Sequence, residues 1–411
     1  EARDVSAAGV IGGGTMGAGI AASMLLSGLS VTMIERDEEA AAAGFERVKG
    51  ILDGSVKRGK LAETERDALL SGKFKAGSDY ALLGEADLTV EAVFEDMDVK
   101  KTVFAELDRA MKPGAILASN TSYLDINEIA SATARPEAVI GLHFFSPAHI
   151  MKLLEIVVAD QTDPDVTATG FKLAKTLRKV AVRSGVCDGF IGNRILARYR
   201  QAADYLMLDG ASPYEIDEAI RAFGFPMGPY QVADLAGLDI GWATRKRKAP
   251  NRDPRERYVA ILDRICEEGH FGRKTGRGLY RYDQGNPKGV PDEEVLAMID
   301  AERTANGIAP RSFTSDKIVE RYMAAMVNEA ARVIEEKIAL RPSDVDVTLL
   351  YGYGFPRFRG GPTLYADLEG PKTILERIES YADEDAFFWQ PASLLRDLAA
   401  SDRTFASLND D

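Results

Sequence analysis

Short apolar runs alternate with amphipathic segments of helix length through the first 190 residues of the chain. The runs are rich in β-branched residues, and the segment 97–111, which lies between two of them, has helical spacing of its apolar residues. Strands that alternate with helices predict an α/β fold with a mostly parallel sheet covered on both faces. The predicted strands lie at 7–11, 30–35, 87–95, 115–122, 138–145, 153–159 and 179–184.

The pattern changes after about residue 190, where the remaining chain reads as mainly helical. GFPMGPYQVADLAG (224–237) is echoed by GFPRFRGGPTLYADLEG (354–370), and a proline beside a serine begins a helical pattern before each. The echo is too long for a solenoid repeat and predicts a duplicated all-α domain. We therefore expect a Rossmann-type nucleotide-binding domain followed by two related helical domains, at 1–186, 187–283 and 284–411, with a Gly- and Pro-rich linker at 283–294.

The composition argues against some classes of function but does not identify one. The 411 residues are 45% apolar and 28% charged, as in ordinary globular proteins, and no apolar stretch is long enough to span a membrane. A net charge of −13 argues against nucleic-acid binding, which depends on cations that contact phosphates. Two cysteines form no disulfide framework and, with no secretory signal visible, fit a reducing cytoplasm, with a peroxisomal origin as the open alternative.

A glycine-rich turn lies directly between the first predicted strand and a helical pattern. Gly12 would permit the tight turn, Gly14 would let the backbone approach a pyrophosphate, and Gly17 would allow close packing of helix and strand. Glu35 ends the second strand, where an acid can bind both ribose hydroxyls and repel a 2′-phosphate. This pattern favours NAD over NADP; Arg36 could soften that preference or be a solvated surface charge.

The chain contains three histidines, and one of them, His143, ends an apolar run. Neutral imidazole suits the removal of a hydroxyl proton, and ligands in such folds bind at the carboxyl ends of strands. Glu155 lies in the next run and could orient the imidazole if the two strands are neighbours. The alternative is a structural histidine within the core.

With these motifs together, the sequence resembles the 3-hydroxyacyl-CoA dehydrogenase family. It is most similar to the dehydrogenase half of multifunctional fatty-acid β-oxidation enzymes, and the resemblance covers nearly the whole chain. The motifs that carry it are IGGGTMGAGIA (11–21), VEAVFEDMDVKKTVFAEL (90–107), SNTSYLDI (119–126), GLHFFSPAHIMKLLEIV (141–157), DGFIGNR (188–194), MGPYQVADLAGLDIGW (227–242), FGRKTGRGLYRY (271–282) and GYGFPRFRGGP (352–362).

The resemblance implies NAD-dependent oxidation of (3S)-hydroxyacyl-CoA, with His143 and Glu155 as the catalytic pair. It also implies that Ser122 binds the substrate oxygen and that Asn193 holds substrate at the domain junction. Ser122 could instead cap a helix, and Asn193 could simply tie the junction together. Further cofactor contacts are implied for Thr15, Met16, Glu95, Lys100 and Asn120, although Glu95 and Lys100 could lie on a solvated helix start and face.

Several features remain secondary. Ser146 stands where the family often has asparagine, which indicates a subfamily. His149 is interpreted as a feature of this subfamily's loop and not as a second catalytic base. No histidine or cysteine cluster has metal-ligand spacing, so no metal is expected. The basic segments 245–248 and 272–277 could contact the phosphates of coenzyme A or be solvated.

The resemblance implies a cleft for acyl-CoA between the nucleotide-binding domain and the first helical domain. Because both helical copies are present, we expect a monomer or weak dimer, of a kind normally fused to an enoyl-CoA hydratase half. Two other functions stay open: a dehydrogenase of small free hydroxy acids, and a family member that binds without catalysis.

Overall fold

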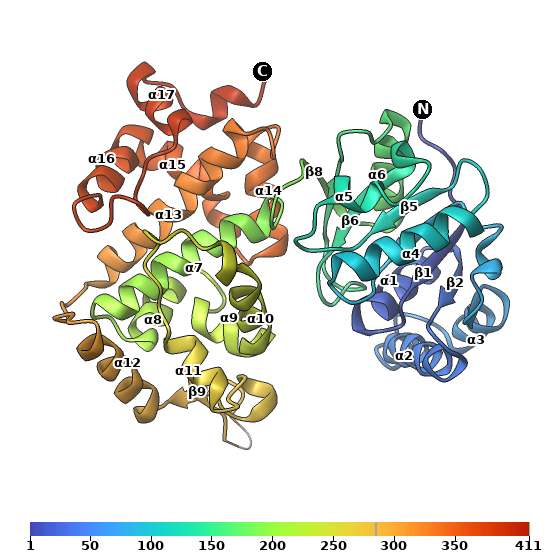
Figure 1. The fold of residues 1–411 in the computed structure, drawn as a ribbon, viewed down its shortest axis with the longest axis horizontal. Helices are drawn as coiled ribbons and strands as arrows, with labels where there is room; N and C mark the ends of the chain where they lie inside the picture. Colours follow the sequence, from blue (N-terminus) through green and yellow to red (C-terminus); the bar gives the residue numbers. More distant parts are fainter. Residues whose placement is uncertain (284–285, 411) are drawn as a thin grey trace. The chain divides into compact units, whose positions relative to one another are not determined.

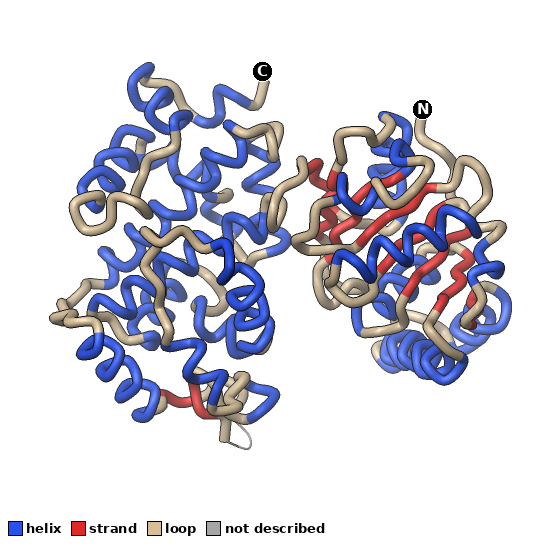
Figure 2. Tube along the Cα trace, viewed as in Figure 1, coloured by secondary structure: helices blue, strands red, loops and turns tan. Residues whose placement is uncertain are grey.

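In the computed structural model, which describes residues 1–283 and 286–410, the chain divides into two compact units. The first contains residues 1–194 together with 336–353, and the second contains 195–335 together with 354–411. The sheet lies in the first unit, and the second is almost entirely helical (Figures 1 and 2). Residues 284–285, within the predicted linker, lie outside the described residues.

An eight-stranded sheet with strand order β3-β2-β1-β4-β5-β6-β7-β8 forms the centre of the first unit. Strands β1 to β6 are parallel, β7 is antiparallel to β6, and β8 is parallel to β7. The predicted α/β class is confirmed, and one strand lies within each of the seven predicted runs, although β4 and β5 are shorter than their runs; the short β3 was not predicted. The strands are β1 (Ala7–Ile11), β2 (Ser30–Ile34), β3 (Phe74–Gly77), β4 (Leu88–Glu91), β5 (Ile116–Ser119), β6 (Val139–Phe144), β7 (Leu153–Val157) and β8 (Val180–Ser184).

Helices cover both faces of this sheet because the buried strands are apolar on both sides. One core packs α1, α2 and α6 against the strands, and the other packs η1, α4 and α5 against the opposite face. The helical elements of this unit before residue 194 are α1 (Thr15–Leu26), α2 (Glu38–Lys57), α3 (Glu63–Gly72), η1 (Tyr80–Leu83), α4 (Met97–Ala110), α5 (Ile126–Ala130), η2 (Pro136–Ala138) and α6 (Pro164–Thr176).

One helix from late in the sequence also belongs to the sheet unit. Helix α14 (Pro342–Gly352) packs against β7 and β8, although it lies within the predicted second helical domain. The backbone N–H of Gly185, after β8, donates to the carbonyl of Ile338, just before this helix, at 2.8 Å. The compact units therefore do not follow the sequence divisions at 186/187 and 283/284, which remain a prediction about sequence units.

The second unit consists mainly of helices, of which α8, α15, α16 and α17 pack against α13, together with one short antiparallel pair of strands. Helix α7 begins at the end of the first unit and runs into the second. The elements are α7 (Gly192–Asp209), α8 (Pro213–Phe223), α9 (Pro229–Ala236), α10 (Leu238–Lys248), η3 (Ala249–Asn251), α11 (Ile261–Glu267), η4 (Arg273–Thr275), β9 (Tyr280–Arg281), β10 (Val290–Pro291), α12 (Glu293–Ala305), α13 (Ser315–Glu335), η5 (Arg357–Arg359), α15 (Pro362–Glu369), α16 (Pro371–Tyr381), α17 (Ser393–Ser401) and η6 (Phe405–Leu408).

Candidate active site

The glycine turn joins the end of β1 to the start of α1 as the sequence predicts. Gly12 has φ = +94°, and a Cβ atom there would lie 2.9 Å from the carbonyl oxygen of Ala92. A Cβ atom on Gly17 would lie 1.8 Å from the carbonyl oxygen of Gly12, which no side chain could tolerate. Glycine is therefore required at both positions, for conformation at the first and for close approach at the second.

The start of helix α1 leaves room for a bound group. A Cβ atom on Gly14, the N-cap residue, would meet no other atom within 4 Å, and Gly14 and Thr15 are exposed. Met16 follows in the first turn and is half-buried. No side chain caps this helix, so its first N–H groups and positive dipole end are available to an anion. This geometry fits the pyrophosphate of a dinucleotide.

Glu35 follows β2 and lies against the same turn. Its Oε1 accepts a hydrogen bond from the backbone N–H of Gly13 at 2.6 Å, which holds the carboxylate beside the glycine turn. Arg36 points elsewhere: its side chain is 84% exposed and pairs with Asp37 at 2.9 Å. The arrangement favours the interpretation of Arg36 as a solvated charge, and it leaves Glu35 as the acidic side chain held at the glycine turn.

Lys100 is buried, and this excludes the alternative that it lies on a solvated helix face. Its side chain is 1% exposed, and its Nζ lies 2.7 Å from Glu91 Oε1 and 3.4 Å from Glu95 Oε2. The second oxygen of Glu91 accepts a hydrogen bond from the hydroxyl of Ser119, the last residue of β5. Lys100 therefore ties α4 to the end of β4, and the bond between Ser119 and Glu91 joins the carboxyl ends of β4 and β5.

Glu95 and Asn120 position the loop that carries Ser122. Glu95 Oε1 accepts hydrogen bonds from the Thr121 hydroxyl at 2.6 Å and from the Ser122 backbone N–H at 2.9 Å. Asn120 Oδ1 accepts from the backbone N–H of Phe144 at 2.8 Å, which ties this loop to the end of β6. The Ser122 hydroxyl makes no hydrogen bond with any described residue and is left for a ligand.

His143 and Glu155 face each other across two neighbouring strands. They are directly paired in the antiparallel register of β6 and β7, and His143 Nδ1 lies 2.6 Å from Glu155 Oε2. The two side chains are 4% and 0% exposed. The charge-assisted contact fixes the imidazole with a proton on Nδ1 and directs Nε2 away from the carboxylate.

The second oxygen of Glu155 is held by backbone groups at the start of α7. Oε1 accepts from the N–H groups of Ile191 and Gly192 at 3.2 and 3.0 Å. Two backbone donors at the start of a helix thus fix the position and orientation of the carboxylate. These partners were not predicted, although both lie within the DGFIGNR motif, because a backbone donor has no residue-type signature.

Asn193 follows in the first turn of α7 and has one partner that sequence reasoning missed. Its Oδ1 accepts a hydrogen bond from the hydroxyl of Tyr353 at 2.9 Å. The carboxamide N–H groups of Asn193 and the Nε2 of His143 have no partner among the described residues. Two groups of opposite hydrogen-bonding capacity are thus left for a ligand, a donor and a potential proton acceptor.

His149 does not join this site. Burial, aided by Arg58 and Lys179, lowers its pKa, and its buried Nδ1 has no hydrogen-bond partner in the described chain. In residues 1–283 and 286–410, no group of three or more His, Cys, Asp or Glu side chains could hold a metal ion. Both cysteines are free.

The basic segments are largely occupied by partners within the second unit. Arg245 pairs with Asp263 at 2.6 Å, and the ammonium of Lys246 lies over the Trp242 ring. Arg277 pairs with Asp292 at 2.7 Å. These pairings favour a structural role for both segments over contact with coenzyme A.

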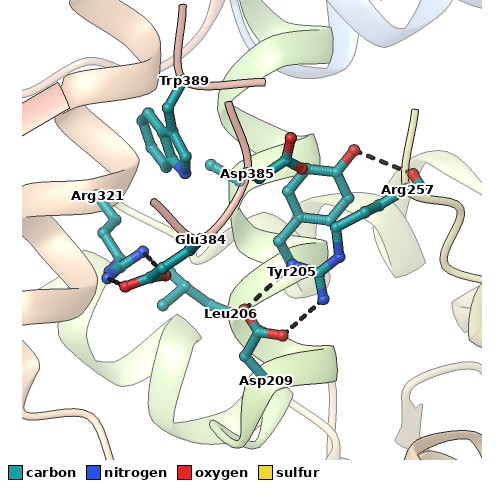
Figure 3. A pocket seen from close by; sticks show the side chains of 9 residues that line it. Tyr205, Leu206, Asp209, Arg257, Arg321, Glu384, Asp385 and Trp389 are labelled. Atoms are coloured by element: carbon teal, nitrogen blue, oxygen red, sulfur yellow. Dashed lines mark hydrogen bonds and ion pairs between the residues drawn. The ribbon is translucent and has the colours of Figure 1, made fainter. Parts of the chain in front are cut away.

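The second unit contains a pocket of about 240 Å³, lined by Asp209 at the end of α7 and by the loop residues Arg257, Ile308, Ala309, Arg311 and Glu384. Figure 3 shows the smaller hollow beside it, where Arg257 pairs with Asp209 and Arg321 pairs with Glu384. Each of these four charges has a partner of opposite sign, and the two pairs tie α7 and α13 to the loops that carry Arg257 and Glu384.

Comparison with known proteins identifies the family to which the chain belongs. The model of the 3-hydroxyacyl-CoA dehydrogenase NAD-binding domain matches residues 7–187, and that of the C-terminal domain matches 189–282 and 318–406. The chain belongs to the 3-hydroxyacyl-CoA dehydrogenase family. The resemblance inferred from the motifs is thereby confirmed, as is the expectation of an NAD-binding domain in the first half of the chain.

Relatives in the family include multifunctional proteins. The "peroxisomal bifunctional enzyme" of Danio rerio is 42% identical over 412 residues, which cover 97% of this chain and 56% of that protein. The human protein of the same name is 41% identical over 420 residues, with 97% and 57% covered. The chain thus spans somewhat more than half the length of these curated relatives.

Solved structures of the family share the fold. A 3-hydroxybutyryl-CoA dehydrogenase of Escherichia coli superposes with a TM-score of 0.83 at 26% identity, covering 97% of this chain and 99% of that one. The dehydrogenase part of multifunctional enzyme 1 from C. elegans gives 0.69 at 30% identity, with 97% and 90% covered. The comparisons assign no role to individual residues, so the roles of Ser122, His143, Glu155 and Asn193 stay predictions.

Proposed function

We propose that the chain catalyses the NAD-dependent oxidation of (3S)-hydroxyacyl-CoA to 3-ketoacyl-CoA. The observation that carries the proposal is the buried pair of His143 and Glu155, which leaves one imidazole nitrogen open at the sheet edge where the glycine turn also lies. Membership of the family and the names of its members support the choice of acyl-CoA as substrate.

In this mechanism Nε2 of His143 accepts the hydroxyl proton of the substrate as its carbon is oxidised. Glu155 stabilises the imidazolium that forms, and the N–H groups of Ile191 and Gly192 hold its carboxylate in place. Ser122 and Asn193 donate hydrogen bonds to the substrate oxygens, since neither side-chain donor is engaged within the described chain. Bound NAD supplies the hydride acceptor.

Residues of the first unit would hold the cofactor. The N–H groups around Gly14, Thr15 and Met16 would bind the pyrophosphate, and Glu35 would bind the ribose hydroxyls. Lys100 and Asn120 would act indirectly. Both bind protein groups, and they thereby position the loops that would face the cofactor. A 2′-phosphate beside Glu35 would meet a carboxylate, which favours NAD over NADP.

The direct test is oxidation of NADH or NADPH by the purified chain with acetoacetyl-CoA, with free acetoacetate as a parallel substrate. We expect turnover with NADH and acetoacetyl-CoA and little with either alternative. Preference for free acetoacetate would instead indicate a dehydrogenase of small hydroxy acids. Binding of NADH without turnover of either substrate would indicate a family member that does not catalyse this reaction.

We also propose that residues 187–283 and 284–411 are two copies of one helical domain and that the chain is a monomer or weak dimer. The two matches of one family model support the duplication.

The bifunctional relatives support fusion to a hydratase half. A cytoplasmic location stays a prediction, since those relatives are named as peroxisomal. No described helix is long and apolar enough to cross a membrane. Light scattering that showed a tight dimer would contradict the proposed oligomeric state.

A further inference from the structure

The second helical copy contains one residue that the first lacks. Helices α8 and α14 both have 11 residues and begin with proline, Pro213 and Pro342. In the first copy Gly224 follows the helix directly, and Phe225-Pro226 come next. In the second copy Tyr353 stands between the end of the helix and the corresponding glycine, Gly354.

This additional residue lies within the sheet unit and against the start of α7. Its hydroxyl donates to Asn193 Oδ1 at 2.9 Å. A Cβ atom on Gly192 would lie only 2.3 Å from the Tyr353 ring, so the ring packs directly on the Gly192 backbone. The N–H of that same glycine binds Glu155.

Aromatic contacts also connect Tyr353 to the histidine. Its ring lies edge-on to Phe145 with centroids 5.6 Å apart, and Phe145 lies 4.4 Å from the imidazole of His143. Helix α14 brings the tyrosine there by packing on β7, the strand of Glu155, where Gly352 leaves space for Leu153. Tyr353 thus contacts Asn193 directly, the Glu155 partner Gly192, and the His143 neighbour Phe145.

We infer that Tyr353 is a positioning residue for the dehydrogenase reaction: its hydroxyl holds the carboxamide of Asn193 so that the amide N–H groups are left for the substrate. The inference rests on the proposed function. A carboxamide on a first-turn residue can rotate about its terminal torsion, which has broad preferences, so a fixed partner on its oxygen selects the donor-outward arrangement. The second helical copy therefore supplies a group to the site through one additional residue.

The experiment compares Tyr353→Phe with wild type in the acetoacetyl-CoA assay, and repeats the substitution in an Asn193→Ala background. Phenylalanine keeps the ring packing and removes only the hydroxyl. We expect kcat to fall about 3- to 10-fold, the effect of one hydrogen bond, with the KM for NADH unchanged. In the Asn193→Ala background the same substitution should change kcat less than twofold, because the two groups act as one unit. Titration with NADH fixes the concentration of folded sites.

A matched control is Tyr381→Phe in α16, since the buried Tyr381 hydroxyl has no hydrogen-bond partner in the described chain and lies in the other unit. Its kcat should equal that of wild type. Unchanged kcat in Tyr353→Phe, or an equal loss in both backgrounds, would overturn the inference. If Tyr353→Phe does not fold, Asn193→Asp, which keeps the oxygen and removes the donor, decides: turnover near that of wild type would overturn it. An inactive wild type would refute the proposed function itself.

Discussion

The two helical copies have similar helices but pack against different partners. Helices α8, α9 and α10 contain 11, 8 and 11 residues, and α14, α15 and α16 repeat these lengths. Yet α8 packs against α13 inside the helical unit, whereas α14 packs against β7 and β8 in the sheet unit. The difference shows that helices of equal length at matching places in the two copies can complete a helical core or cover a sheet, depending on which apolar surface they meet.

An aspartate retained in both copies shows what the duplication preserves. It is the sixth residue of α9 (Asp234) and of α15 (Asp367). Asp234 accepts from the backbone N–H groups of Leu279 and Tyr280, and Asp367 accepts from those of Phe405 and Ala406. In each copy, a carboxylate therefore holds a later segment of the chain by two adjacent backbone donors. We call these two contacts the Asp234 and Asp367 clasps. The clasp is present in both copies, whereas the first helix of each copy packs against a different partner.

The largest expected effect is a loss of turnover at the candidate active site, with no effect on folding. His143→Gln should lower turnover about 10²- to 10⁴-fold, because the general base is lost, while the chain folds and binds NADH. Acetoacetyl-CoA reduction and NADH fluorescence titration measure the two properties. Turnover within about threefold of wild type would remove His143 from its proposed role.

The clasps themselves should differ in strength. Asp234→Ala should lower the free energy of unfolding by about 2–4 kcal/mol, because it leaves two buried N–H groups and the Tyr282 hydroxyl without their acceptor. Asp367→Ala, at a less buried carboxylate with two backbone donors, should cost about 1–2 kcal/mol. Urea denaturation of both variants gives the order, and the reverse order would show that burial does not decide it.

The smallest expected effect concerns acid stability. Burial alone would raise the pKa of Glu384, but hydrogen bonds from Arg311 and Arg321 outweigh it and lower the pKa to about 2. An acid with a lowered pKa stabilises the fold above its ordinary pKa, near 4.5, and this contribution is lost as the pH falls toward 2. It should amount to about 1–2 kcal/mol after solvent screening.

Glu384→Gln should therefore destabilise the chain at pH 7 and flatten the decline of stability between pH 4.5 and 3. Thermal unfolding across this range, with Glu379→Gln as a control at an exposed ion pair, measures the effect. A parallel decline in variant and wild type would show that the Arg311 and Arg321 pairs contribute nothing at neutral pH.

The sequence by itself determined the parts of the protein that depend on local pattern. Short apolar runs predicted seven of the eight strands, since a strand buried on both faces must be apolar throughout. The glycine turn was readable because Gly12 and Gly17 are required by backbone conformation and close approach, which only one residue type satisfies. His143 and Glu155 were readable because titratable groups within apolar runs are rare.

Only the tertiary structure decided which distant groups meet. It paired His143 with Glu155 in the β6–β7 register, and it supplied the backbone donors of Ile191 and Gly192, which have no signature in the sequence. It also placed α14 on the sheet and brought Tyr353 to Asn193, 160 residues earlier in the chain. The physical reason is that hydrophobic burial is not directional: an apolar helix face indicates that a partner exists, and only the packing of the whole chain selects which one.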